Sequence, residues 1–167
     1  MSNPLLKSLF EHKAWSNQRL IEALRAAPAD VDRRQMAIVL LTLEHTGIVD
    51  QIFKARLIGG EHGFTAVNEN RRPDIDQLGE MLRATDAWYV DYAGQITEDE
   101  LQAVVEFTYV SDGEPGRMTK GEILGHIITH GAAHRGAIGK MLEALGVSGP
   151  SDMMTTFRRP GGGAIGH

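Results

Sequence analysis

Residues 119–145 place their apolar side chains three and four positions apart, which is the repeat of an amphipathic α-helix. Thr119 and Glu122 form a capping-box pattern at its start, and Gly146 follows its end. The inner stripe of this helix consists of Ile123, Ile127, His130, His134, Ile138, Met141 and Leu145. Two histidines therefore occupy positions that a helical core normally fills with apolar residues, so this segment constrains both the fold and the site.

Three other long segments have the same helical repeat: 4–26, 33–58 and 74–96. The second has one predicted buried stripe, with His45 in its middle; the stripe consists of Ile38, Leu41, His45, Ile48 and Ile52. The first has a polar middle, His12, Lys13, Ser16 and Asn17, which is either a solvated face or the border of a polar cavity. Together the four segments predict an all-α fold, a four-helix bundle.

The remaining segments predict smaller elements within one domain, residues 1–160. Thr97 and Glu100 repeat the capping pattern at a short helical turn. Residues 103–118, rich in β-branched and aromatic residues, predict a short hairpin or an extended excursion before the last long helix. Residues 147–160 predict one short turn, and the glycine-rich residues 161–167 predict a disordered tail.

Composition excludes several classes of function. Cysteine is absent, which rules out disulfides and thiolate chemistry and fits a cytoplasmic location. The net charge of −5 argues against a nucleic-acid partner. Charges interrupt the apolar runs before the ~20 residues of a membrane span, and the N-terminus lacks the pattern of a signal peptide, so no membrane partner is expected. A small-molecule substrate remains.

The histidines of the last helix lie four residues apart, at His126, His130 and His134. Each step of four rises about 6 Å and turns about 40° around the helix, so two neighbouring imidazoles can converge on one metal ion. All three cannot, since the outer two lie about 12 Å apart along the axis. The pair is therefore either 126/130 or 130/134, and another helix must supply a third ligand.

His45 is the natural third ligand, because its imidazole faces the core among aliphatic residues, although a buried hydrogen-bond partner would satisfy it equally. Three imidazoles suit Zn, Ni, Fe or Cu and leave a coordination position open for water or substrate. Asp50 lies about 140° around the helix from His45 and is expected outside the first coordination shell. Outer-shell or pocket candidates are His126, His12, Asn17, Arg135 and Glu44.

Three segments of this chain resemble the DinB (damage-inducible) family, also called the DinB/YfiT-like metalloenzymes. They are LFEHKAWSNQRLIEAL, LTLEHTGIVDQIFKARLIGG and GEILGHIITHGAAHRGAIGKMLEALG, the last of which is the most specific. The resemblance implies an up-down-down-up four-helix bundle, frequently a homodimer, with a Ni or Zn ion on His45, His130 and His134. His126 matches a histidine near the site that is not a ligand.

The resemblance does not imply one reaction, although some relatives use low-molecular-weight thiols as cosubstrates. The leading hypothesis is a metal-dependent transferase or hydrolase whose open coordination position activates a thiol or a water molecule. The alternative is a metal-binding stress-response protein without catalysis, in which the ion cross-links two helices. A third possibility is a bundle whose core histidines are only hydrogen-bonded.

Overall fold

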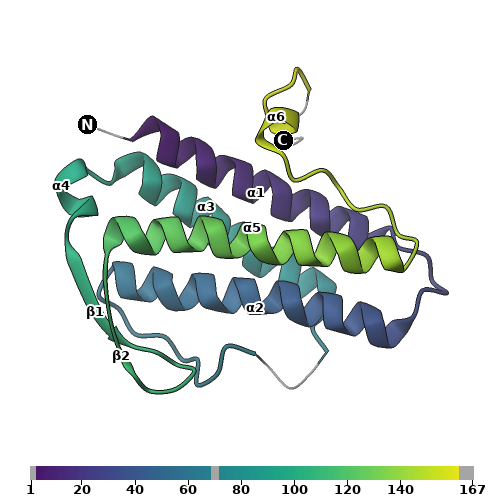
Figure 1. The fold of residues 1–167 in the computed structure, drawn as a ribbon, viewed down its shortest axis with the longest axis horizontal. Helices are drawn as coiled ribbons and strands as arrows, with labels where there is room; N and C mark the ends of the chain where they lie inside the picture. The colour runs from purple at the N-terminus through teal and green to yellow at the C-terminus, as the bar shows by residue number, and fades with distance from the viewer. Residues whose placement is uncertain (1–2, 69–71, 162–167) are drawn as a thin grey trace.

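The computed structural model describes residues 3–68 and 72–161. It contains four long helices, α1 (Pro4–Arg25), α2 (Arg33–Leu57), α3 (Ile75–Gln95) and α5 (Lys120–Ala144) (Figure 1). Two short helices, α4 (Glu98–Leu101) and α6 (Met154–Phe157), and two strands, β1 (Val104–Thr108) and β2 (Pro115–Thr119), complete the described part. The predicted all-α class is confirmed, with one small hairpin added. Apart from Gly161, the predicted tail 161–167 lies outside the described residues.

The helices begin where the sequence provides side-chain caps. Thr119 accepts a hydrogen bond from the backbone N–H of Glu122, whose carboxylate accepts one from the Thr119 N–H, which completes the predicted capping box of α5. Thr97 and Glu100 form the same arrangement at α4. Asp74 caps α3 by accepting from two backbone N–H groups.

Contacts between the long helices show their relative directions. Antiparallel α1 and α3 pair Arg25 near the end of α1 with Asp76 near the start of α3. Gly47 of α2 lies against Leu82 of α3, and further along both helices the Tyr89 hydroxyl donates to the Asp50 carbonyl, so α2 and α3 are parallel. Helices α1 and α5 run in one direction and α2 and α3 in the other (Figure 1).

The apolar core is divided into two clusters by a polar layer. One cluster centres on Phe10, Tyr89 and Ile127, and the other on Leu43 and Leu142. Between these levels of the helices lie buried polar residues from all four long helices; they are Lys13, Ser16, Asn17, Asp50, Asp86 and Arg135. The polar middle of α1 is therefore buried, and the interpretation as a solvated face is wrong.

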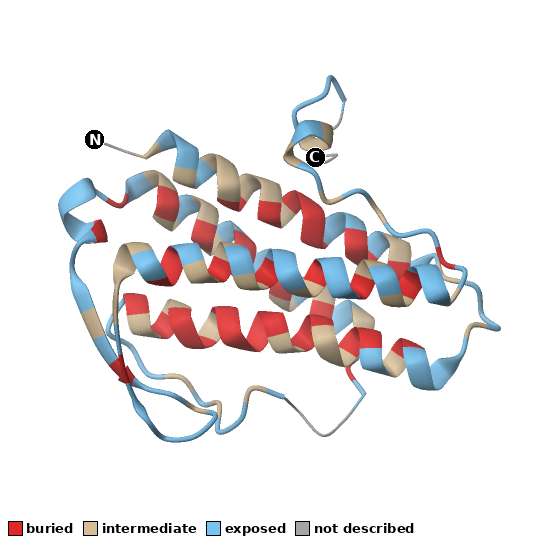
Figure 2. Ribbon diagram, viewed as in Figure 1, coloured by how far each residue is buried: buried red, intermediate tan, exposed pale blue. Residues whose placement is uncertain are grey.

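Helix α2 is buried on more of its circumference than the single predicted stripe (Figure 2). Nearly every residue of its middle turns is buried, because α2 packs against both α3 and α5. Ile38, predicted in the stripe, is instead 54% exposed near the start of the helix, where its side chain faces solvent. By length and composition, α2 is apolar enough to cross a membrane, although the charges that interrupt the apolar runs of the sequence did not predict this. However, 67% of the apolar window of α2 is buried inside the protein. Its apolar composition is that of a core helix.

The predicted hairpin is confirmed by strands β1 and β2, which pair antiparallel from Val104–Thr119 to Thr108–Pro115. Phe107 is paired with Gly116, and a Cβ atom at Gly116 would lie only 2.4 Å from the Phe107 ring. The glycine thus leaves room for the ring to lie across the neighbouring strand. The hairpin runs alongside the ends of α2 and α5, as Figure 1 shows.

Candidate metal centre

Helices α2 and α5 bring three imidazoles together at the level of the polar layer. One ring nitrogen of each of His45, His130 and His134 lies within 4.8 Å of the others. The ring centroids are separated by 5.2 Å for His45–His130, 5.0 Å for His45–His134 and 4.5 Å for His130–His134. Of the two neighbouring pairs on α5, the structure therefore joins His130 and His134 to His45.

The distance between two of these nitrogens matches that of a metal centre. Nε2 of His45 and Nε2 of His130 are 3.3 Å apart. Tetrahedral coordination with Zn–N bonds of about 2.0–2.1 Å would separate two ligand nitrogens by about 3.3–3.4 Å. The same spacing permits a hydrogen bond between the two imidazoles. The three-histidine cluster is thus compatible with metal binding.

The loop after α2 orients His45. Nδ1 of His45 lies 2.9 Å from the carbonyl oxygen of Val67. Because a carbonyl oxygen can only accept, Nδ1 carries the proton and donates it, which leaves the lone pair of Nε2 directed at the cluster. Metal-binding histidines are usually held by such a hydrogen bond from the other ring nitrogen.

The imidazoles on α5 are neutral at pH 7. Burial, together with the adjoining His134, His126 and His45, lowers the pKa of His130 to about 4. Burial also lowers the pKa of His134. Neutral imidazoles keep the lone pair that a transition metal needs. Among the described residues, Nδ1 of His130 has no hydrogen-bond partner although it is buried.

His126 lies beside the cluster and outside it. Its ring stacks on His130 with centroids 5.1 Å apart, and it meets the Phe53 ring edge to face at 5.3 Å. Burial lowers the pKa of His126 as well. His126 was expected near the site but not as a ligand. Its ring forms part of the wall of the space next to His130.

That space is a cavity of about 340 Å³ between α2, α5 and the β-hairpin, referred to below as the hairpin cavity. Its described lining consists of His45, Val49, Ile52, Phe53, Val67, Phe107, Thr108, Tyr109, Val110, Ser111, Met118, His126 and His130. Two of the three clustered histidines thus face a pocket lined mostly by apolar and aromatic side chains. Such a combination is common in small-molecule sites.

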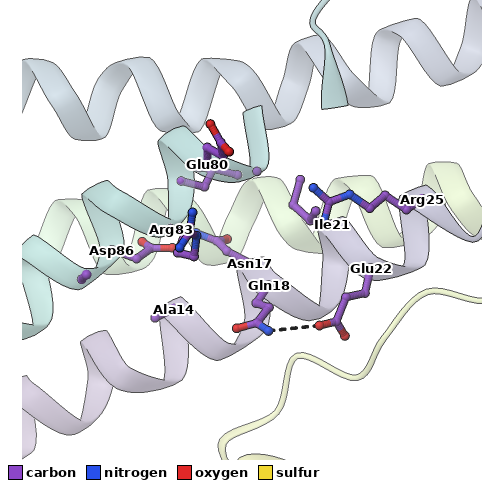
Figure 3. Close-up of a pocket in the computed structure, with 12 residues that line it drawn as sticks. Ala14, Asn17, Gln18, Ile21, Glu22, Arg25, Glu80, Arg83 and Asp86 are labelled. Carbon is purple, nitrogen blue, oxygen red and sulfur yellow. Dashed lines mark hydrogen bonds between the residues drawn. The ribbon is translucent and has the colours of Figure 1, made fainter. Parts of the chain in front are cut away.

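A second cavity, of about 470 Å³, lies between α1 and α3 and has a different character (Figure 3). Charged side chains from both helices surround it, including Arg25, Arg83 and Glu22, and Gln18 donates a hydrogen bond to Glu22 across one side. None of the clustered histidines is among its described lining residues. It is separate from the three-histidine site.

A buried ionic network crosses the polar layer on the α1 side of the bundle. The Lys13 ammonium group donates to Asp50 at 2.6 Å and to Asp86 at 2.5 Å, and all three side chains are almost fully buried. Burial alone would lower the pKa of Lys13, but the two carboxylates outweigh it and raise that pKa. Burial raises the pKa of Asp50 to about 6 against the opposing effect of Lys13.

Two other predicted site residues belong to this network. Asn17 donates to Asp86 at 2.8 Å and accepts from Arg135 at 3.2 Å. Arg135 also donates to Asp152, at 2.8 Å. Both residues belong to the α1 side of the polar layer, whereas the three histidines lie between α2 and α5.

His12 lies apart from the histidine cluster, against the C-terminal segment. Its ring contacts Phe157 edge to face at 5.7 Å and lies 3.6 Å from the Asp152 carboxylate.

Asp50, which was expected outside the first coordination shell, directs one carboxylate oxygen to Lys13. Glu44 lines a small cavity shared with α3. Sequence reasoning did not single out the Lys13–Asp50–Asp86 group or the Val67 carbonyl.

Comparisons with known proteins identify the family of this chain. The DinB family profile matches residues 1–161. Protein DinB of Bacillus subtilis (strain 168) is 22% identical over 155 residues, covering 86% of this chain and 88% of that protein. No solved structure gave a significant match. Because the profile spans nearly the whole sequence, this chain belongs to the DinB family.

Proposed function

We propose that this protein binds one divalent transition-metal ion on His45, His130 and His134 and acts as a metal-dependent enzyme. The observation that carries the proposal is the pair of Nε2 atoms 3.3 Å apart, one of them on a ring oriented by the Val67 carbonyl. Three imidazole ligands favour Zn or Ni, with Fe as a third choice, over Mg or Ca. Family membership supports the same donor set.

Three protein ligands leave a coordination position that can face the hairpin cavity, since His45 and His130 line it. A bound divalent ion lowers the pKa of a coordinated water molecule or thiol and so supplies a nucleophile at neutral pH. The protein's own contribution is to hold the imidazoles and to fix the His45 ring through Val67. We therefore favour a thiol-dependent transferase or a hydrolase.

The metal site is tested by elemental analysis of protein purified without a metal-affinity column. Wild-type protein should contain about one Zn, Ni or Fe per chain, and His45→Ala and His130→Ala should both lose it. His62→Ala is the matched control, because His62 lies in the loop after α2, outside the cluster. Wild-type protein without stoichiometric metal, even after reconstitution, would refute the site.

The use of a thiol cosubstrate is tested on protein loaded with Co²⁺, whose visible spectrum reports its ligands. Saturation with a low-molecular-weight thiol should add a thiolate-to-metal absorption band. If no thiol changes the spectrum, the thiol-dependent transferase activity is excluded and hydrolysis remains as the proposed activity. Homodimer formation and a cytoplasmic location stay predictions, the first of which light scattering can test.

The alternative is a non-catalytic metal-binding stress protein, in which the ion cross-links α2 and α5. The position of the cluster between these two long helices is the observation that favours it. It predicts a coordination shell that exchanges no ligand with solvent and a large loss of stability on chelation. Co²⁺ spectra recorded with azide as well as with thiol distinguish the two functions, because a closed shell would respond to neither, whereas a hydrolase keeps a coordination position that azide can occupy.

A further inference from the structure

The hairpin cavity adjoins the proposed metal site on the side of β1 and β2. His45 and His130 are among its lining residues, as are the hairpin residues Phe107, Val110 and Met118. Its volume of about 340 Å³ is at the low end of the range of about 300–1,000 Å³ for small-molecule pockets. A ligand that fills it is therefore at the small end of the molecules that such pockets bind.

The described residues that line the hairpin cavity include no acidic side chain and no lysine or arginine. The polar side chains of this lining are hydroxyl groups and imidazoles. A carboxylate or ammonium group placed there would lose its hydration without gaining a partner of opposite charge, at a cost of several kcal/mol. The α1–α3 cavity differs in this respect, because its lining includes arginines and glutamates (Figure 3).

Aromatic rings form a wall of defined shape in the cavity. Phe107 meets Phe53 edge to face at 5.5 Å and Tyr109 at 5.0 Å. The close approach to Gly116 holds the Phe107 ring against the neighbouring strand. Rings in this arrangement present faces and edges that pack well against a further ring.

We propose that the hairpin cavity binds a neutral, apolar part of the substrate, of aromatic-ring size, and places it beside His45 and His130. This specificity rests on the proposed function for its role in a reaction, but binding itself does not require the metal. The carboxylate groups of a thiol cosubstrate would lose their hydration in this cavity. The cavity therefore fits the other substrate of the reaction.

The proposal is tested with the neutral fluorescent dye N-phenyl-1-naphthylamine, on protein as purified and after chelation of metal. The dye should bind at one site per chain in both. Met118→Trp or Val110→Trp should fill the cavity and weaken dye binding at least about tenfold, a loss of about 1.4 kcal/mol or more. Val104→Trp is the matched control, since Val104 is on β1, is 45% exposed and is outside the lining; it should stay within about twofold.

The preference for neutral over charged ligands is measured on protein from which the metal has been removed by a chelator, because no metal can then attract an anion. Naphthalene-2-methanol should displace the dye at a concentration at least about tenfold lower than 2-naphthoate. Equal displacement by both compounds, or unchanged dye affinity in both tryptophan variants that remain folded by circular dichroism, would overturn the proposal. Dye binding by a protein that takes up no metal would support the cavity and refute only the metal function, whereas metal-loaded protein that binds no dye would refute only the cavity.

Discussion

Replacing Lys13 with methionine removes the ammonium group that two buried carboxylates share. Lys13 is 1% exposed, and Asp50 and Asp86 are 0% and 3% exposed, so water cannot easily replace the lost partner. Asn17 would still donate to Asp86, but Asp50 would lose its described side-chain donor. Breaking a buried ion pair by removing one partner costs about 3–5 kcal/mol, because the remaining charge is left without compensation. We expect Lys13→Met to lose that amount at pH 7.

The loss should depend on pH in a defined direction. The pKa of Asp50 is about 6 in the folded protein and 3.8 in the unfolded chain, so the folded state holds an extra proton between about pH 4 and pH 6. The stability that this proton contributes is fully present below pH 4 and is lost as the pH rises to 6. At pH 5 Asp50 is mostly protonated with or without Lys13, so the cost of Lys13→Met should fall by at least about 1 kcal/mol.

Urea denaturation of wild type and Lys13→Met at pH 5 and pH 7 measures these differences, with an unchanged m-value as evidence of a two-state comparison. The double variant Lys13→Met/Asp50→Asn should recover part of the loss, since it removes the stranded charge as well. A loss below about 1 kcal/mol at pH 7, or an equal loss at both pH values, would refute the interpretation of this group as a buried ionic network.

Three smaller changes test other parts of the fold. Thr119→Ala removes the cap of α5 and should cost about 1 kcal/mol in urea denaturation; an unchanged midpoint would contradict the capping box. Gly116→Ala should destabilise the protein by about 1–3 kcal/mol, because the new methyl group meets the Phe107 ring, and a gain in thermal stability would contradict this contact. Gly125→Ala, in an open position of α5, should instead stabilise by about 0.5–1 kcal/mol, and a lower melting temperature would count against it.

The sequence was sufficient for much of the fold because its long helices carry strong local signals. Apolar repeats locate the four long helices, and capping boxes locate the starts of α4 and α5. The same periodicity places His130 and His134 on one face of α5, and His45 on a core-facing position of α2. These features depend on spacing within a single helix, which one sequence contains in full.

Features that depend on the partner helix were not predictable in the same way. Lys13 looks like a solvated residue until α2 and α3 bring Asp50 and Asp86 to it, from positions 37 and 73 residues away. Ile38 fits the helical repeat, but the buried face at that end of α2 is formed by Met36, Val39 and Leu40, so Ile38 faces solvent. Val67 contributes a backbone carbonyl, which carries no signal in its side chain. In each case the deciding contact comes from tertiary packing.

X-ray absorption spectroscopy of the metal-loaded protein tests the central claim most directly, since it counts the imidazole ligands of the ion. We expect three imidazole nitrogens at about 2.0–2.1 Å for zinc, with one further ligand that solvent or an added molecule can exchange. His134→Ala should lower the count to two or lose the ion. A spectrum with fewer than three imidazoles in the wild-type protein, or a spectrum unchanged in His134→Ala, would contradict the three-histidine site.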